Sequence, residues 1–266
     1  MTNQTVFITG ASSGIGRALA KEFANQKADL ILTARRLDRL QSLVADIQTS
    51  GGSAIPIQCD VTRDGDLDRA VKVALETYGK LDIVIANAGF GVAGDFEVFS
   101  VEDYRRQFET NVFGVLRTIY ATLDSLKKSK GTLVLIGSVC GYVSLPGGSP
   151  YAMSKFAIHA LAQSLTHELR PYGVSVVLIA PGFIESEFRQ VDNQGNFHPL
   201  VEDPISSRLR MPTEKAAKQM VRAILQKKSE EIITHHGKWI IFIKRHFPWV
   251  LDICIKMGLR ARPEPK

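Results

Sequence analysis

Short apolar runs alternate with longer amphipathic segments along most of the chain. The short runs are rich in Val, Ile and Leu, which is typical of parallel strands covered on both faces. They predict seven strands, at residues 6–9, 29–34, 54–58, 82–86, 132–137, 174–180 and 231–234. The longer segments predict helices near residues 14–26, 37–50, 64–78, 101–127, 151–170 and 213–227. Strict alternation of strand and helix predicts a doubly wound sheet or a barrel.

The domain organisation follows from the same pattern, because the sequence holds no internal repeat and no low-complexity linker. We predict one α/β domain over residues 1–237, a doubly wound Rossmann fold whose parallel seven-stranded sheet has helices on both faces. A C-terminal helical extension is expected over residues 238–266. Residues 185–211 are polar and broken by Gly195, Pro199 and Pro204, and we expect them to form a lid that orders on substrate.

A glycine-rich turn follows the first predicted strand, with the sequence Thr9-Gly10-Ala11-Ser12-Ser13-Gly14-Ile15-Gly16. Glycine lets a backbone turn sharply and approach a ligand, and the next helix offers free N–H groups and its positive dipole end. Such a turn could serve tight packing alone. Its place between the first strand and the first helix favours the binding of a dinucleotide pyrophosphate.

Arg35 and Arg36 follow the second predicted strand, at the end that faces the adenosine ribose in a doubly wound fold. The planar fork and fixed charge of arginine match a 2′-phosphate, whereas an acidic residue would bind the 2′-hydroxyl. The alternative is a solvated helix start, because Leu37-Asp38-Arg39 continues polar. Our hypothesis is that the cofactor is NADP(H).

Further motifs follow in a fixed order: Asn87-Ala88-Gly89 after the fourth predicted strand, Ser138 after the fifth, Tyr151-Ala152-Met153-Ser154-Lys155, and Pro181-Gly182 after the sixth. Together with the glycine turn, they make residues 5–235 resemble the short-chain dehydrogenase/reductase family. Each motif alone is weak, but the set at these intervals is highly specific. The resemblance implies a nicotinamide-dependent oxidoreductase that acts on CH–OH or C=O groups.

The catalytic chemistry can also be argued from the residues. Tyr151 and Lys155 are four residues apart, so they share one helix face. A nearby ammonium is expected to lower the pKa of the phenol, which makes Tyr151 a general acid/base. Ser138, at the C-terminal end of a strand, can hold a substrate carbonyl or alkoxide. The resemblance implies that Asn111 holds a water linking Lys155 to solvent. A Tyr on a helix face is more often core, and a Ser after a strand more often belongs to a turn.

The resemblance and the fold together imply a larger cofactor-binding set. Asp60 and Val61, after the third predicted strand, are expected to contact adenine, and Lys155 to bind the nicotinamide ribose. Asn87 and Gly89 are expected to shape the floor of the cofactor site. The full expected set is Gly10, Ser12, Ser13, Gly14, Ile15, Gly16, Arg35, Arg36, Asp60, Val61, Asn87, Ala88, Gly89, Tyr151, Lys155, Pro181, Gly182 and Ile184.

The substrate pocket is expected in the loops beyond the strand ends. The candidates are mostly apolar, which suits a hydrophobic carbonyl or hydroxy compound, although each could instead belong to the core. They are Ser138, Cys140, Tyr142, Phe183 and Phe188, and Cys140 is expected to be a neutral thiol. The leading interpretation is an NADPH-dependent carbonyl reductase or alcohol dehydrogenase. The alternatives are a 3-oxoacyl reductase and a non-catalytic dinucleotide-sensing protein.

The net charge of +6 would by itself suggest a nucleic-acid partner. Its distribution argues otherwise: residues 1–207 hold 19 Lys and Arg against 22 Asp and Glu, whereas residues 208–266 hold 14 against 5. We therefore expect no nucleic-acid partner. The C-terminal part also interleaves Trp239, Trp249 and other apolar residues with its cations, in runs too short to span a bilayer. It predicts either an interfacial membrane segment or a segment that packs over the pocket or against a partner subunit.

The remaining features set the expected surroundings of the protein. Cys59, Cys140 and Cys254 lie far apart without ligand spacing, so we expect no disulfide framework and no metal site. His159, His167 and His198 also lack ligand spacing and are expected to have surface or packing roles. The sequence starts with strand-like residues rather than a secretory signal, which favours a cytoplasmic protein, with membrane association through the tail as the alternative. A homodimer or homotetramer is expected.

Overall fold

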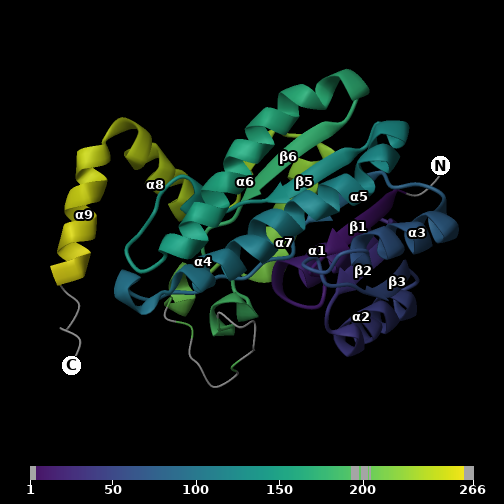
Figure 1. Ribbon diagram of the computed structural model, residues 1–266, viewed down its shortest axis with the longest axis horizontal. Coiled ribbons are helices and arrows are strands. Elements are labelled where there is room, and N and C mark those ends of the chain that lie inside the picture. The colour runs from purple at the N-terminus through teal and green to yellow at the C-terminus, as the bar shows by residue number, and fades with distance from the viewer. Residues whose placement is uncertain (1–3, 193–197, 199–202, 204, 261–266) are drawn as a thin grey trace.

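The computed structural model describes residues 4–192, 198, 203 and 205–260. Its core is a seven-stranded parallel sheet in the order β3-β2-β1-β4-β5-β6-β7 (Figure 1). The strands are β1 (Thr5–Thr9), β2 (Asp29–Ala34), β3 (Ser53–Gln58), β4 (Ile83–Ala86), β5 (Thr132–Ile136), β6 (Ser175–Ala180) and β7 (Glu230–Ile232). The predicted doubly wound Rossmann fold is confirmed, and the barrel alternative is excluded because the strand order has two edges.

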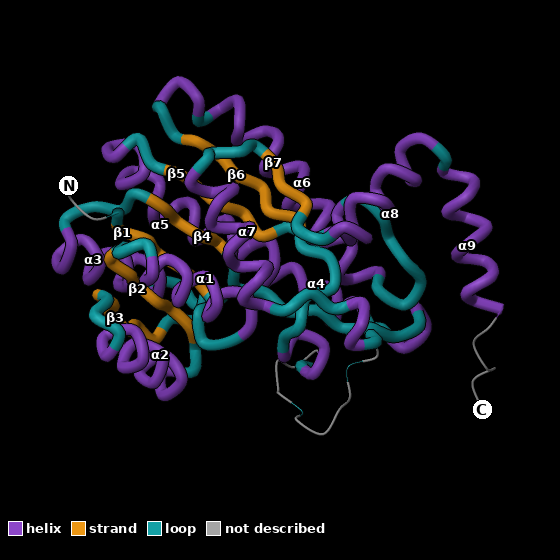
Figure 2. Tube along the Cα trace, turned by 180° about the vertical axis from the view of Figure 1, so that it is seen from behind, coloured by secondary structure: helices purple, strands orange, loops and turns teal. Residues whose placement is uncertain are grey.

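Helices cover both faces of the sheet (Figures 1 and 2). The helices of the described residues are α1 (Gly14–Asn25), α2 (Leu37–Thr49), α3 (Asp66–Tyr78), α4 (Val101–Phe108), α5 (Gly114–Ser129), α6 (Ser149–Glu168), α7 (Thr213–Leu225), α8 (His235–His246) and α9 (Pro248–Arg260), of which α1, α2, α7, α3, α5 and α6 contribute to the two cores beside the sheet. Successive residues of a strand point to opposite faces, so β1 sends Val6 and Ile8 into a core shared with α1, α2 and α7. Phe7 points the other way, into a second core shared with α3, α5 and α6. Both faces are therefore sealed by apolar packing.

The strand order reverses between β1 and β4, and this reversal positions the site. β1 pairs with β2 on one side and with β4 on the other. The loops that leave the C-terminal ends of these two strands separate to opposite faces and leave a crevice between them. The glycine turn follows β1, and Asn87-Ala88-Gly89 follows β4. Both motifs therefore meet at the crevice in which doubly wound sheets bind their ligands.

The predicted helix over residues 101–127 is wrong as a single element. It is interrupted by one π-helical turn, Glu109–Phe113, between α4 and α5. The cause is local: the buried side chain of Asn111 bonds the backbone of Phe90, and the wider turn accommodates it. Propensity alone cannot show such a turn, because its residues are ordinary in a helix.

The C-terminal extension is helical, as expected, but it begins earlier than residue 238. Thr234 caps α8, its hydroxyl accepting the N–H of Gly237 at 3.3 Å, and the helix begins at His235. Within the described residues, no helix is both long and apolar enough to cross a bilayer. The predicted lid is described only in part: short helical turns at Glu187–Gln190 and Ser207–Leu209, and a bridge between Ile184 and Met211. Gly195, Pro199 and Pro204 lie outside the described residues.

Candidate active site

The glycine turn has a geometry that larger residues cannot adopt. Gly10 has a φ of 68°, and a Cβ atom there would lie 2.8 Å from Cα of Ala88. A Cβ on Gly16 would lie 2.4 Å from the carbonyl oxygen of Gly10. The turn is therefore packed against the loop after β4, and α1 begins at Gly14 with its first N–H groups directed at the crevice. Ser13 stands at the cap position, but its hydroxyl makes no cap bond and instead accepts a hydrogen bond from Arg36.

Asn87 and Thr9 lock this turn in place. The Asn87 amide donates to the carbonyl oxygens of Thr9 at 2.8 Å and Gly10 at 3.2 Å. The Thr9 hydroxyl accepts the N–H groups of Asn87 and Ala88, each at 3.0 Å. Asn87 thus joins the loop after β4 to the glycine turn, and its role as the floor of a cofactor site stays a prediction. The bonding role of Thr9 was not predicted, although its position at the end of β1 could have indicated it.

Arg36 connects the end of β2 to the glycine turn, whereas Arg35 is exposed. Its guanidinium donates to the Ser12 hydroxyl at 3.1 Å and to the Ser13 hydroxyl at 2.7 Å. The same group lies 3.4 Å from the carboxylate of Glu187, which Arg39 also binds at 2.8 Å. The two arginines predicted together therefore differ, because only Arg36 makes these contacts with the turn. Glu187 and Arg39 were not predicted.

Ser138, Tyr151 and Lys155 come together at the carboxyl ends of β5 and β6. Ser138 follows β5, while Tyr151 and Lys155 lie in the first two turns of α6, which starts at Ser149. The Ser138 hydroxyl lies near the Tyr151 hydroxyl and favours the ionised form of the phenol. The Lys155 ammonium lies 5.7 Å from the centre of the Tyr151 ring and donates to the carbonyl oxygen of Ile136 at 2.8 Å. The structure thus brings these three predicted side chains together.

The ionisation of this group differs from the prediction. Burial raises the pKa of Tyr151 above its usual value, and the nearby Ser138 hydroxyl offsets this only in part. Burial lowers the pKa of Lys155 to about 8. The expectation that Lys155 lowers the pKa of Tyr151 is therefore wrong for this structure, because desolvation of the phenol dominates. Tyr151 keeps its proton at neutral pH, which is the state a proton donor needs.

Asn111 holds the loop after β4 against α6. Its side-chain amide donates to the carbonyl oxygen of Phe90 at 2.9 Å and to the Ser154 hydroxyl at 3.1 Å, and its oxygen accepts the N–H of Phe90. Ser154 in turn donates to the carbonyl oxygen of Tyr151 at 2.7 Å. This chain of bonds ties Asn111 to the backbone that carries Tyr151. The water relay implied by the family resemblance stays a prediction.

His159 is a site neighbour that the sequence analysis assigned only a surface or packing role. It is buried one helical turn after Lys155, and its Nε2 accepts the N–H of Ser138 at 3.3 Å. A Cβ on Gly137 or Gly141 would lie 2.4 Å from this nitrogen, so two glycines make room for the ring. Burial, together with nearby Lys155, lowers the pKa of His159 to about 4, so it packs as a neutral ring beneath Ser138.

The predicted substrate residues separate into two groups. Phe188 packs edge-on against Tyr151 with 5.2 Å between ring centres, and Cys140 lies beside Ser138, whose hydroxyl accepts its N–H at 3.1 Å. Burial raises the pKa of the Cys140 thiol, so this thiol is neutral, as expected. Tyr142 instead packs on His159 at 4.3 Å, and Phe183 stacks on His236 of α8 at 5.1 Å. These two rings are engaged in packing and do not join Tyr151.

The remaining predicted cofactor residues lie around the crevice. The Asp60 carboxylate accepts hydrogen bonds from the N–H and the hydroxyl of Thr62 and so shapes the turn after β3. The Val61 side chain packs so closely against Gly114 that a Cβ atom on this glycine would clash with it. Gly182 lies so close to α8 that a Cβ there would meet the Thr234 hydroxyl at 2.1 Å. The Ile184 side chain is buried in the core rather than exposed to the crevice. The side chain of Ile184 therefore packs in the core.

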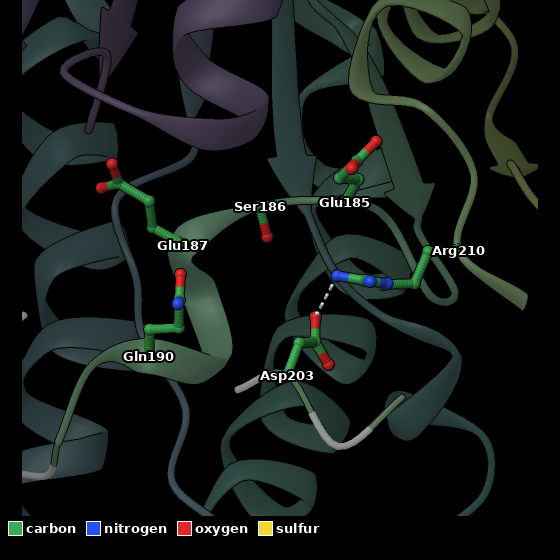
Figure 3. A pocket seen from close by; sticks show the side chains of 6 residues that line it. All are labelled: Glu185, Ser186, Glu187, Gln190, Asp203 and Arg210. Carbon is green, nitrogen blue, oxygen red and sulfur yellow. Dashed lines mark hydrogen bonds and ion pairs between the residues drawn. The ribbon is translucent and has the colours of Figure 1, made fainter. Parts of the chain in front are cut away.

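A polar cavity of about 510 Å³ borders the glycine turn. Its lining comes from the segment after β6 and from the predicted lid: Glu185, Ser186, Glu187, Gln190, Asp203 and Arg210 (Figure 3). Ser186 marks its position, because a Cβ on Gly14 would lie 3.3 Å from Cβ of Ser186. Asp203 is held by Arg189 at 2.6 Å and by Arg210 at 3.2 Å, and these ion pairs lower the pKa of its carboxyl. The cavity therefore lies beside the glycine turn, and Tyr151 is not among its lining residues.

The described residues contain no cluster of three or more side chains suited to hold a metal ion. Cys59 is buried, Cys140 is partly buried and Cys254 is exposed, and all three are free thiols in the structure. The site is thus built from hydroxyl, phenol, ammonium and amide groups.

Comparison with known proteins agrees with this geometry. The short chain dehydrogenase family matches residues 4–196, and the chain belongs to that family of NAD(P)-dependent oxidoreductases. An uncharacterized oxidoreductase of Listeria monocytogenes is 35% identical over 188 residues, which are 70% of this chain and 76% of the relative. One of Myxococcus xanthus is 36% identical over 195 residues, which are 73% of this chain and 77% of the relative.

Two solved structures show the same fold. The alcohol dehydrogenase of the archaeon Thermococcus sibiricus, complexed with 5-hydroxy-NADP, superposes with a TM-score of 0.76 at 29% identity and covers 86% of this chain and 95% of its own. A short chain dehydrogenase/reductase of Burkholderia phymatum in complex with NAD gives a TM-score of 0.82 at 22% identity, covering 99% and 97%. The two neighbours hold different nicotinamide cofactors, so the choice between them rests on residues of this chain.

Proposed function

We propose that this protein is an NADPH-dependent carbonyl reductase or alcohol dehydrogenase that acts on a hydrophobic ketone or hydroxy compound. The observation that carries the proposal is the grouping of Ser138 with a partly exposed, protonated Tyr151 and a buried Lys155. A phenol that keeps its proton beside a hydroxyl is arranged to protonate an oxygen placed between them.

The crevice fits a nicotinamide dinucleotide. Gly10 and Gly16 let the turn pack against the loop after β4 more closely than any residue with a Cβ could, and the N–H groups at the start of α1 suit a pyrophosphate. Arg36 supports NADP(H), because its charged fork lies beside Ser12 and Ser13, where the adenosine ribose is expected. Following the family resemblance, we assign Lys155 to the nicotinamide ribose and Asp60 to the adenine side.

In this mechanism the bound nicotinamide supplies hydride to the carbonyl carbon. Ser138 donates a hydrogen bond to the carbonyl oxygen and fixes its position. Tyr151 transfers its proton to that oxygen as the alcohol forms. The positive charge of Lys155 stabilises the phenolate that Tyr151 becomes. Phe188 and the neutral Cys140 thiol flank the reacting atoms with apolar surface, which favours a hydrophobic substrate.

The substrate class is tested by following NADPH consumption with a panel of ketones graded by chain length and ring count. We expect kcat/KM to rise with apolar size, with 3-oxoacyl thioesters no better than ketones of equal length. An enzyme that turned over only small polar carbonyls, or none of the panel, would contradict the proposal. The expected assembly is a homodimer or homotetramer, which sedimentation analysis of the same preparation measures.

Replacing Arg36 by alanine should change the cofactor preference. The guanidinium faces the Ser12 and Ser13 hydroxyls, and hydrogen bonds to a charged group contribute ~1.5–3 kcal/mol each, so the Kd for NADPH should rise about 10- to 100-fold. The Kd for NADH, which has no 2′-phosphate, should change less than about twofold on the same argument. Titration of protein fluorescence with each cofactor gives both constants.

Arg35→Ala is the matched control, because Arg35 is exposed and the contacts with Ser12 and Ser13 are made by Arg36. We expect a smaller effect on NADPH from this variant than from Arg36→Ala. Equal weakening of NADPH and NADH by Arg36→Ala would overturn the NADP(H) assignment.

A further inference from the structure

The two C-terminal helices form a unit that is attached to the fold at its beginning. The Nε2 atom of His236, in the first turn of α8, accepts the N–H of Phe183 at 3.1 Å, next to the cofactor loop. Ile241, in the middle of α8, and Leu251, near the start of α9, are both buried. Figures 1 and 2 both show α9 beyond α8, on the side away from the sheet. The pair is therefore anchored at one end and extends from the body.

The outer side chains of this pair are unusually apolar. Six apolar side chains have exposed fractions between 47% and 65%: Trp239, Phe242, Phe247, Trp249, Ile253 and Met257. Together with the cations described in the next paragraph, they form what we call the α8–α9 surface. On α9, Trp249, Ile253 and Met257 follow at intervals of four residues and so share one helix face. The rings of Trp239 and Phe242 lie 6.0 Å apart, and those of Phe242 and Phe247 6.3 Å apart. Exposed apolar groups gathered in this way mark a binding surface.

Cations are interleaved with these apolar side chains. Lys238, Lys244, Arg245 and Lys256 are all exposed, and Asp252 is the acidic residue within residues 235–257. Aromatic and aliphatic groups combined with Lys and Arg are typical of segments that lie in the interface of an anionic membrane. We propose that the α8–α9 surface binds the surface of an anionic lipid bilayer. The proposal does not depend on the enzyme's substrate.

A second copy of the chain is a less suitable occupant. In a two-fold symmetric contact the same patch meets itself, so a surface that carries Lys244, Arg245 and Lys256 would be brought against an equally cationic one. Like charges brought together across an interface cost free energy, whereas anionic headgroups neutralise them. The charge of the surface therefore favours lipid.

The test is co-sedimentation of the full-length protein with vesicles of phosphatidylcholine alone and of phosphatidylcholine with phosphatidylglycerol. We expect at least tenfold stronger binding to the anionic vesicles and a loss of that binding at high salt. The double variants Trp239→Ser/Trp249→Ser and Lys244→Glu/Arg245→Glu should each lower the partition coefficient at least tenfold. NADPH binding is measured on every variant to confirm that the crevice is intact.

The matched control is Tyr120→Ser, because Tyr120 is a 75% exposed aromatic residue on α5, outside this surface. It should bind vesicles like the wild type. Wild-type protein that stays in the supernatant with anionic vesicles overturns the proposal. A second result would also overturn it: wild-type protein that binds no vesicles but forms an oligomer, which dissociates in the Trp239→Ser/Trp249→Ser variant. That result would identify a second copy of the chain as the partner of this surface.

A different observation, the ion pair of Glu187, carries a second inference, which rests on the proposed use of NADP(H). Glu187 reaches from the segment after β6 to Arg36 at 3.4 Å and to Arg39 at 2.8 Å, although 151 residues separate it from Arg36 along the chain. Arg36 at the same time bonds Ser12 and Ser13 of the glycine turn. We infer that the Glu187 carboxylate competes with the 2′-phosphate of the cofactor for Arg36 and so sets the affinity for NADPH.

The inference predicts that Glu187→Gln binds NADPH at least fivefold more tightly, with NADH changed less than twofold. Glu185→Gln is the control, because Glu185 lines the same cavity with an exposed side chain and should leave both cofactors unchanged. Unchanged or weaker NADPH binding by Glu187→Gln overturns the competition. If Glu187→Gln fails in this way but Arg36→Ala still weakens the binding of NADPH and not of NADH, the NADP(H) assignment is retained. Equal effects of Arg36→Ala on both cofactors would instead remove the assignment itself.

Discussion

Tyr151→Phe should lower kcat for carbonyl reduction by about 10²–10⁴, the range that positioned proton transfer contributes to enzymatic rates. The variant removes only the hydroxyl that lies near Ser138 and whose pKa is raised by desolvation. The ring remains and can still pack against Phe188. The loss should therefore appear in kcat, measured under saturating NADPH with the best ketone of the panel.

The variant also tests whether the fold around the site is unaffected. We expect the Kd for NADPH and the melting temperature to stay close to those of the wild type, because Tyr151 donates no bond to the backbone that forms the crevice. Retention of wild-type turnover would rule out Tyr151 as the proton donor. Loss of NADPH binding together with activity would indicate a structural role instead.

Much of the fold could be predicted because it depends on local patterns. The apolar runs of β1, β2 and β5 and the glycines of the first turn are legible from neighbouring residues alone, and each was found within about one residue of its place. The grouping of Ser138, Tyr151 and Lys155 followed from their order along a doubly wound sheet. Ser138 and the glycine turn each follow the end of a strand, and the strand order of the sheet determines which of these loops lie side by side.

The parts that were missed depend on contacts between distant segments. Glu187 and Arg36 are far apart in sequence, and no local pattern shows that a carboxylate from the predicted lid reaches the arginine after β2. His159 looked like an ordinary helix residue, and its bond to Ser138 exists only because Gly137 and Gly141 leave room for the ring. The pKa of Tyr151 was predicted in the wrong direction because spacing shows the neighbour Lys155 but not the depth of burial.

Lys155→Met should have two effects of opposite sign. Turnover should fall at least about 100-fold, because the charge that stabilises the Tyr151 phenolate and the group assigned to the nicotinamide ribose are both removed. Stability at neutral pH should rise, because burial lowers the pKa of Lys155 to about 8 from 10.5 in its unperturbed form. Folding therefore places a charged ammonium in a poorly solvated site, and methionine fills that site without a charge.

The pH dependence of this stability difference follows from linkage. The folded state binds the proton of Lys155 less tightly than the unfolded state, so the penalty is complete below about pH 8 and disappears above about pH 10.5. Allowing for the lost bond to Ile136, the variant should gain about 2 kcal/mol at pH 7, or about 5 °C in Tm. Calorimetry of both proteins from pH 7 to pH 10.5 measures the difference, and the gain should shrink steadily across that range. A variant that is less stable than the wild type at every pH would mean that the bond to Ile136 outweighs the desolvation of the ammonium.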